Sequence, residues 1–209
     1  MTVMNFIIMI KRRREFTREI KIWAVYFLAI LFSAYIHELG HCIPAWIHGF
    51  RAIPTPAKEY ISGEIPQDIR QVISLGGIIG TIVVSFTILV LYICKPSTLT
   101  STLLASALVV PGFYMLRFFL IGRGHDGTEF QEAQSVLGLS YSGHFLDFFF
   151  LALFLFGVII WIIKSKPGLK IWKRWLIGFI LTFIFFIGLQ ELNNSIFDPI
   201  LQSKHIIEK

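Results

Sequence analysis

The sequence carries few charged residues: Asp, Glu, Lys and Arg together make up 15% of its 209 residues. A soluble domain usually has about 25%. Hydrophobic residues make up 55%, and many of them fall in runs of roughly 20, the length that crosses the hydrocarbon core of a bilayer. The scarcity of charge therefore excludes an ordinary soluble domain and indicates an integral membrane protein.

Cysteine is also scarce, and alternation of polar and apolar residues is missing. Only Cys42 and Cys94 are present, which gives no disulfide framework, and we expect them near opposite membrane faces. The apolar runs lack the two-residue period of barrel strands. Because only helices and closed barrels satisfy the backbone in lipid, the runs are predicted to be helices.

Apolar segments divide the chain into membrane spans. The sequence contains no evident internal repeat or low-complexity tract. We predict an all-α, polytopic helical bundle of about five transmembrane helices, forming one membrane-embedded domain over residues 1–209. Gly76, Gly77 and Gly80, near the start of the second span, are expected to allow close helix contact. The expected spans cover residues 22–43, 71–93, 102–121, 144–163 and 175–190.

The protein has a net charge of +6, and its basic residues lie mostly beside the apolar spans. That placement favours membrane orientation and lipid phosphates over nucleic acid as the partner of the basic residues. On the N-terminal side of the predicted topology lie twelve of the nineteen Lys and Arg residues, so the positive-inside rule predicts a cytoplasmic N-terminus. The twelve are Lys11, Arg12, Arg13, Arg14, Arg18, Lys21, Lys95, Lys164, Lys166, Lys170, Lys173 and Arg174.

The last third of the first span contains the sequence H-E-L-G-H, residues 37–41. Residues four apart lie on one face of a helix, so His37 and His41 can bind the same metal ion. The adjacent Glu38 can act as a general base toward a water, which is the arrangement of zinc-dependent hydrolases. Ionisable residues at membrane depth are functional by default, and Zn²⁺ is the predicted cofactor.

A catalytic zinc usually takes a third protein ligand. The segment 122–130 follows the third span on the membrane side where the first span ends, so both reach the same depth. Asp126, His125 and Glu129 are the candidates, and spacing alone does not choose among them. His48 and His144 are weaker candidates, and Arg123, Glu129 and Glu132 can line a polar path for water.

Three stretches in this order resemble the site-2 protease family of intramembrane zinc metalloproteases: H-E-L-G-H (37–41), I-S-L-G-G-I-I-G (73–80) and G-H-D-G (124–127). The resemblance covers a metalloprotease-like core at residues 22–130, and residues 144–190 add further transmembrane helices. It implies His37, His41 and Asp126 as ligands and Glu38 as base. The chain departs from the family pattern because Ile78 follows Gly77 and His125 precedes Asp126.

We therefore expect an intramembrane zinc endopeptidase whose partners are the lipid bilayer and a transmembrane segment of a substrate protein. The alternatives are a metal-binding or metal-transporting membrane protein, and an inactive relative that binds client helices. The linker 50–70 can form short membrane-associated strands around Glu59–Ser62, as the resemblance implies, or be a plain connecting loop. The resemblance implies a zinc site toward the cytosol, whereas the charge count implies the opposite face, so the orientation stays open.

Overall fold

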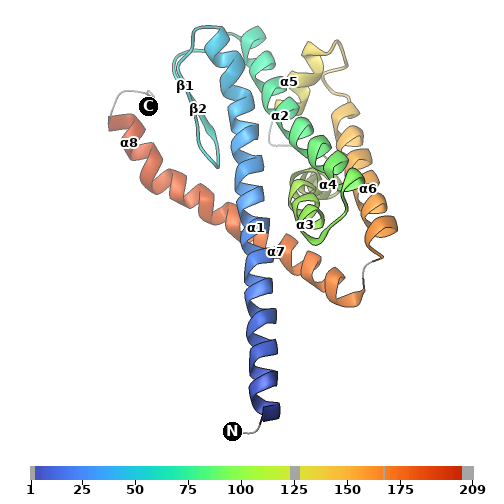
Figure 1. Ribbon diagram of the computed structural model, residues 1–209. Coiled ribbons are helices and arrows are strands. Elements are labelled where there is room, and N and C mark those ends of the chain that lie inside the picture. The colour runs from blue at the N-terminus through green and yellow to red at the C-terminus, as the bar shows by residue number, and fades with distance from the viewer. Residues whose placement is uncertain (1–2, 123–127, 167, 204–209) are drawn as a thin grey trace.

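The computed structural model describes residues 3–122, 128–166 and 168–203, and helices make up most of it (Figure 1). In the described part of the chain, one short antiparallel hairpin is the only sheet. The elements in chain order are α1 (Val3–Ile47), β1 (Ala52–Pro54), β2 (Glu59–Ile61), α2 (Gln67–Cys94), α3 (Thr98–Ala107), α4 (Val109–Ile121), α5 (Glu129–Val136), α6 (Phe145–Ser165), α7 (Leu169–Leu192), the π-helical turn η1 (Asn193–Phe197) and α8 (Asp198–Ser203).

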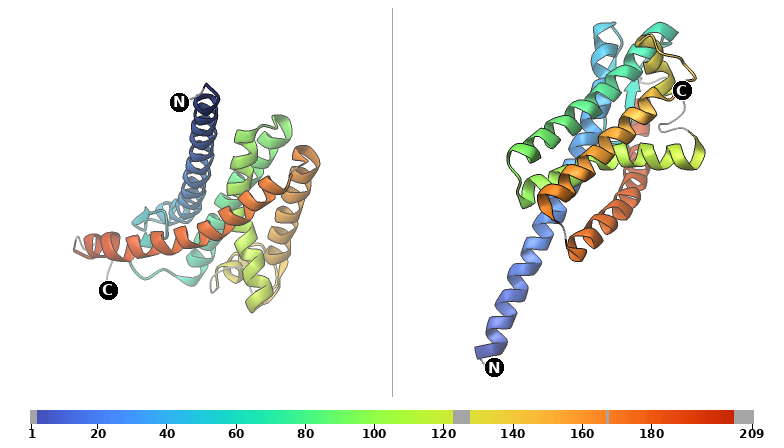
Figure 2. Two further views of the ribbon diagram at one scale, coloured as in Figure 1. Left: turned by 90° about the horizontal axis from the view of Figure 1, so that it is seen from below. Right: turned by 90° about the vertical axis from the view of Figure 1, so that its right-hand side faces the viewer.

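Five helical segments among the described residues are long and apolar enough to cross a membrane, which confirms the predicted helical membrane fold. The helix of the first segment begins at Val3 and not near Ile22, because Lys, Arg and Glu are good helix formers and continue α1 on the N-terminal side of the apolar run. The N-terminal half of α1 projects from the bundle (Figure 2). The five segments are Arg13–Ile47, Gln67–Cys94, Thr98–Ile121, Phe145–Ser165 and Ile171–Leu201.

The third segment differs from the single helix expected over 102–121, because it breaks at Leu108 into α3 and α4. Pro111 has no backbone N–H and cannot donate to the carbonyl of Ala107, four residues earlier. The hydroxyl of Ser85 on α2 donates to this carbonyl instead, at 3.2 Å. The break therefore leaves no unsatisfied acceptor at Ala107, as an apolar surrounding requires.

Glycines set the distance between α1 and α2, the most closely packed pair of helices. A Cβ atom on Gly40 would lie 2.9 Å from the carbonyl carbon of Gly76, and one on Gly80 would lie 2.7 Å from the carbonyl oxygen of Ile36. Contacts this short are not tolerated, so only glycine permits the approach. The prediction that glycines of the second span allow close helix contact is confirmed. On α1, Gly40 inside H-E-L-G-H makes the same close approach from the other side.

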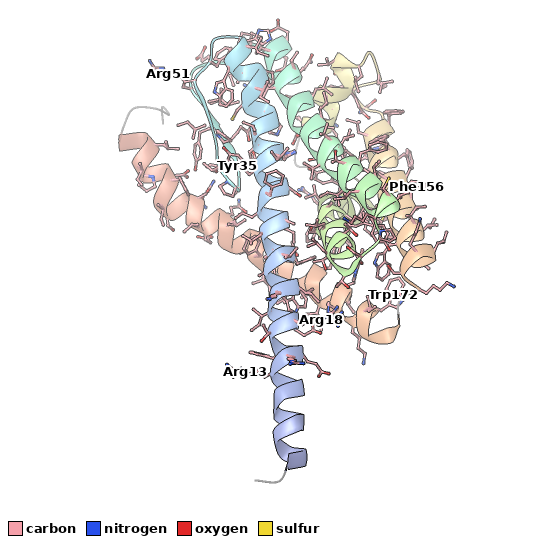
Figure 3. The ribbon with its side chains drawn as sticks, viewed as in Figure 1. Arg13, Arg18, Tyr35, Arg51, Phe156 and Trp172 are labelled. Atoms are coloured by element: carbon pink, nitrogen blue, oxygen red, sulfur yellow. The ribbon has the colours of Figure 1, made fainter. Side chains whose placement is uncertain are left out.

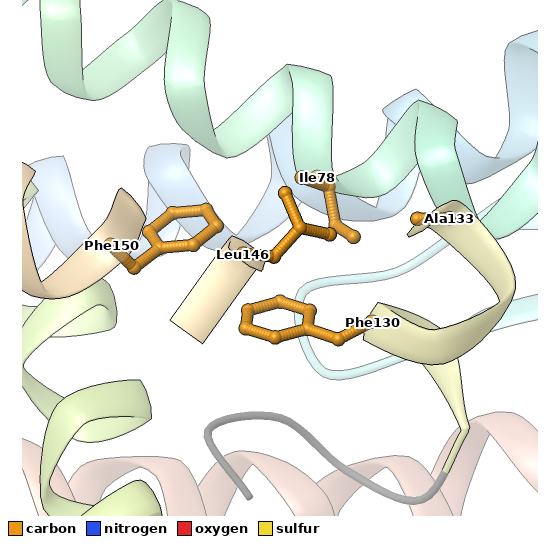
Figure 4. Packing of buried hydrophobic residues seen from close by; sticks show 5 residues of the cluster. All are labelled: Ile78, Phe130, Ala133, Leu146 and Phe150. Carbon is orange, nitrogen blue, oxygen red and sulfur yellow. The ribbon is translucent and has the colours of Figure 1, made fainter. Parts of the chain in front are cut away.

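A hydrophobic cluster fixes the short helix α5 against α2 and α6 (Figure 4). Phe130 is 6% exposed and stacks on Phe150 of α6, with ring centroids 5.4 Å apart and planes inclined by 12°. Ile78 on α2 and Leu146 on α6 complete the cluster with Ala133. Because Phe130 is the second residue of α5, this packing also fixes the position of Glu129, the first.

The β1–β2 hairpin lies along α1 and is tied to the C-terminal part of the chain. The amide of Asn193, in η1, donates to the hydroxyl of Thr55 at 2.8 Å, and both residues are buried. Asp198 forms an ion pair with Lys58 at 3.1 Å and accepts a hydrogen bond from the hydroxyl of Tyr60. Burial, together with this hydrogen bond, raises the pKa of Tyr60, so the phenol stays a donor. Of the two possibilities for the linker 50–70, short strands or a plain connecting loop, the structure has the strands.

Candidate metal centre

His37 and His41 lie one turn apart on the face of α1 that packs against α2. Their Nε2 atoms are 3.2 Å apart and their ring planes are nearly perpendicular, at 88°. His41 is 4% exposed, and the side chain of His37 is 12% exposed. The four-residue spacing predicted from the sequence thus brings two imidazoles together in a largely buried position.

The other nitrogen of each ring is held by α2. The Nδ1 atom of His41 lies 2.8 Å from the carbonyl oxygen of Ile73, and that of His37 lies 2.9 Å from both the carbonyl oxygen of Gly77 and the hydroxyl of Thr81. A carbonyl oxygen only accepts, so each Nδ1 carries the hydrogen. In the neutral rings, both Nε2 atoms then present lone pairs to the same point, which is how histidines that bind metal are usually oriented.

Gly77 makes room for this arrangement. A Cβ atom at this position would collide with the imidazole of His41, with its Cδ2 atom at 2.7 Å and two further ring atoms still closer. Any other residue at position 77 would displace the ring or separate the two helices. The glycine-containing stretch of α2 therefore serves both the packing of α1 on α2 and the orientation of a candidate ligand.

Glu129 brings a carboxylate to the two imidazoles from the first turn of α5. Its Oε1 atom lies 3.5 Å from Nε2 of His41 and 3.8 Å from Nε2 of His37, and its side chain is 13% exposed. Zinc bonds of about 2.0–2.2 Å place neighbouring ligand atoms of a tetrahedral site roughly 3.3–3.6 Å apart. The three observed separations, 3.2, 3.5 and 3.8 Å, lie close to these values, so His37, His41 and Glu129 fit a zinc ion.

Glu38 lies on the other side of His41, facing the hairpin. Its carboxyl group interacts with both the side chain and the backbone of Glu59 in β2. One ligand atom each from Glu38, His41 and Glu59 lie within 4.8 Å of one another, and Glu38 is 9% exposed. Glu38 is thus a buried carboxyl group beside His41, next to the candidate metal centre.

Some of the predicted site residues lie away from the two histidines or outside the described residues. Asp126, the third ligand implied by the family resemblance, lies outside the described residues with His125 and Arg123, so their roles stay predictions. His48 is exposed beyond the end of α1. His144 is bound to Asp147 at 3.0 Å and is far more exposed than the two central histidines.

Glu132, one of the three residues expected to line a polar path for water, is buried between two helices. This residue is 5% exposed, and its carboxylate accepts a hydrogen bond of 2.6 Å from the hydroxyl of Ser74, so it joins α5 to α2.

Sequence reasoning named Glu59 only as part of an extended run and did not single out Thr81. Both are brought to the histidines by tertiary contacts, which have no periodic signal in the sequence.

Comparisons with known proteins found no match to this chain among family models, curated proteins or solved structures. The likeness to the site-2 protease family therefore rests on the three short stretches of sequence. The chemistry of the site has to be argued from the described residues themselves.

Proposed function

We propose that this protein is a zinc-dependent endopeptidase that hydrolyses peptide bonds in or near the transmembrane segments of other membrane proteins. The observation that carries the proposal is the orientation of the two histidines. Each Nδ1 is bound to α2, and the two Nε2 atoms converge with the Glu129 carboxylate at separations suited to zinc. Glu38, the expected base, lies beside them.

The acidic residues around the histidines also favour a bound cation. Glu38, which is 9% exposed, interacts electrostatically with both Glu59 and Glu129. Like charges this close are costly where water is scarce, and a divalent cation offsets them. In this proposal the third protein ligand is a carboxylate from the segment after α4. The geometry favours Glu129, the family resemblance implies Asp126, and the proposal allows both to bind.

When bound, zinc would polarise the substrate carbonyl and acidify a water molecule. Glu38 would take a proton from the attacking water and deliver it to the nitrogen of the leaving amine, so that each turnover restores its carboxylate. Ile73, Gly77 and Thr81 would keep the two rings in the tautomer that leaves Nε2 available.

The hairpin offers a place for an extended substrate. In the described chain, no third strand pairs with β1 and β2, and β2 brings Glu59 to the side chain of Glu38. An unwound segment can add to such an edge through backbone hydrogen bonds. Binding there would hold a peptide bond beside the proposed base, and the helical form of a transmembrane substrate would have to open first.

Replacing Glu38 by Gln tests the mechanism, because the amide keeps the size of the side chain and cannot accept the proton. We expect zinc content to persist and the cleavage of a co-expressed single-span substrate to fall by about 10²–10⁴-fold. The matched control is Glu64→Gln, which neutralises an exposed acid of the linker. Cleavage by Glu38→Gln at the level of this control would refute the mechanism.

One observation favours a second function, the movement of metal ions. The groups His37–His41–Glu129 and Glu38–His41–Glu59 share His41, so an ion passing from one to the other can stay bound to His41 while it exchanges its other two ligands. Zinc flux into proteoliposomes distinguishes the two functions. A transporter would carry zinc and lose flux in Glu59→Gln, whereas a peptidase would show no flux and retain its zinc.

A further inference from the structure

A cavity lies at the opposite end of the bundle from the histidines. Its volume is about 630 Å³, within the usual range of pockets for small ligands, roughly 300–1,000 Å³. Residues of α1, α2, α3, α4, α6 and α7 line it. Between Tyr26, the α1 residue of the lining nearest to the histidines in the sequence, and His37, α1 rises by about 16 Å, so the cavity is separate from the candidate metal centre.

The charged residues that line this cavity are, in the described chain, all cationic: Arg18 on α1, Lys164 on α6 and Arg174 on α7. Arg174 is paired with Glu19 at 2.5 Å, which partly neutralises it. The Nζ atom of Lys164 lies 3.3 Å from the carbonyl oxygen of Ile93, which holds it beside the cavity. Arg18 is exposed. The attraction for an anion therefore comes mainly from Arg18 and Lys164.

Aromatic and aliphatic side chains form the rest of the lining. Trp23 and Trp172 lie near the cations, and Figure 3 shows Arg18 and Trp172 in the lower part of the bundle, on neighbouring helices. Val109, Phe154 and Phe179 line the cavity nearer the middle of the apolar helices. Tryptophans and cations together at the ends of membrane spans are typical of the level of lipid headgroups.

We propose that this cavity binds one anionic glycerophospholipid from the leaflet at this end of the protein. The phosphate of the anionic headgroup contacts Arg18 and Lys164, and an acyl chain lies along Trp23, Phe154 and Phe179. Complementary charge selects the anionic headgroup over a zwitterionic one, and the apolar depth of the cavity selects a lipid over a soluble phosphate.

Native mass spectrometry of the purified protein with equal amounts of phosphatidylglycerol and phosphatidylcholine of the same chain length tests the proposal. We expect the protein to retain phosphatidylglycerol preferentially. The double variant Arg18→Gln/Lys164→Gln should bind it about 25-fold less tightly, or roughly fivefold for each charge removed near a membrane surface. Its affinity for phosphatidylcholine should change little.

The matched control is Arg13→Gln/Lys173→Gln, which removes the same charge from exposed positions of α1 and α7 that do not line the cavity. A second variant, Val158→Phe, fills part of the cavity and should weaken the binding of both lipids. Circular dichroism checks that each variant remains folded. Equal binding of the two lipids by the unmodified protein, an equal loss in the control, or displacement by inorganic phosphate would each overturn the proposal.

Discussion

The Nε2 atoms of His37 and His41 lie 3.2 Å apart, while the Nδ1 atom of each ring is bound to a backbone carbonyl of α2. In neutral imidazoles this places two lone pairs against each other inside a membrane helix. Such an arrangement is unfavourable unless a cation lies between the rings. Together with the carboxylate of Glu129, this pair is the basis for the proposed zinc site and for the predictions that concern it.

Two variants distinguish the possible third ligands. If Glu129 binds the metal, Glu129→Gln should lower zinc content and activity together, because the amide is a much poorer ligand, whereas Asp126→Asn should affect both less. If Asp126 is the ligand, as the family resemblance implies, the order reverses. Zinc is measured by elemental analysis of the purified variants. Full zinc content and activity in Glu129→Gln would exclude this residue as a ligand.

Gly77→Ala should weaken zinc binding even though residue 77 contributes no side chain to the site. The added Cβ atom collides with the ring of His41 and would turn the ring away from His37 or separate α1 from α2. We expect affinity to fall by about 10–100-fold, the range for residues that orient a ligand. Competition with a chelator measures the change.

The control for this variant is Gly188→Ala, at an exposed position of α7 where a Cβ atom meets nothing within 4 Å. It should leave zinc affinity unchanged and stabilise the helix slightly, because alanine is the better helix former. An equal effect of the two substitutions on zinc affinity would contradict the role given to Gly77.

Asn193→Ala should loosen the β1–β2 hairpin from the C-terminal helices. It removes the buried hydrogen bond to Thr55, which contributes about 1 kcal/mol. Hydrogen exchange of the amides in residues 52–61 should then become roughly fivefold faster where local opening controls exchange. The neighbouring variant Asn194→Ala changes an exposed residue and should leave exchange as it is. Equal exchange in both variants would show that η1 does not hold the hairpin.

The sequence predicted the helical membrane fold because long apolar runs have few stable alternatives in lipid. It also predicted that His37 and His41 share a helix face, since their spacing needs only helical geometry. The predicted span boundaries differ from the helices in two places. Charged helix formers extend α1 on the N-terminal side of the first span, and the third span breaks at Leu108. The effect of Pro111 there depends on how the freed carbonyl is satisfied, which Ser85 on another helix decides.

Tertiary structure decided which groups surround the imidazoles, including which of the candidate carboxylates reaches them among the described residues. Gly77 and Thr81 reach His37 because glycines let α2 approach α1, and Glu129 reaches both rings because the packing of Phe130 fixes the first turn of α5. Glu59 reaches Glu38 through the hairpin. Each of these contacts joins segments far apart in the chain, and the distance between such segments depends on packing, which local patterns of residues do not encode.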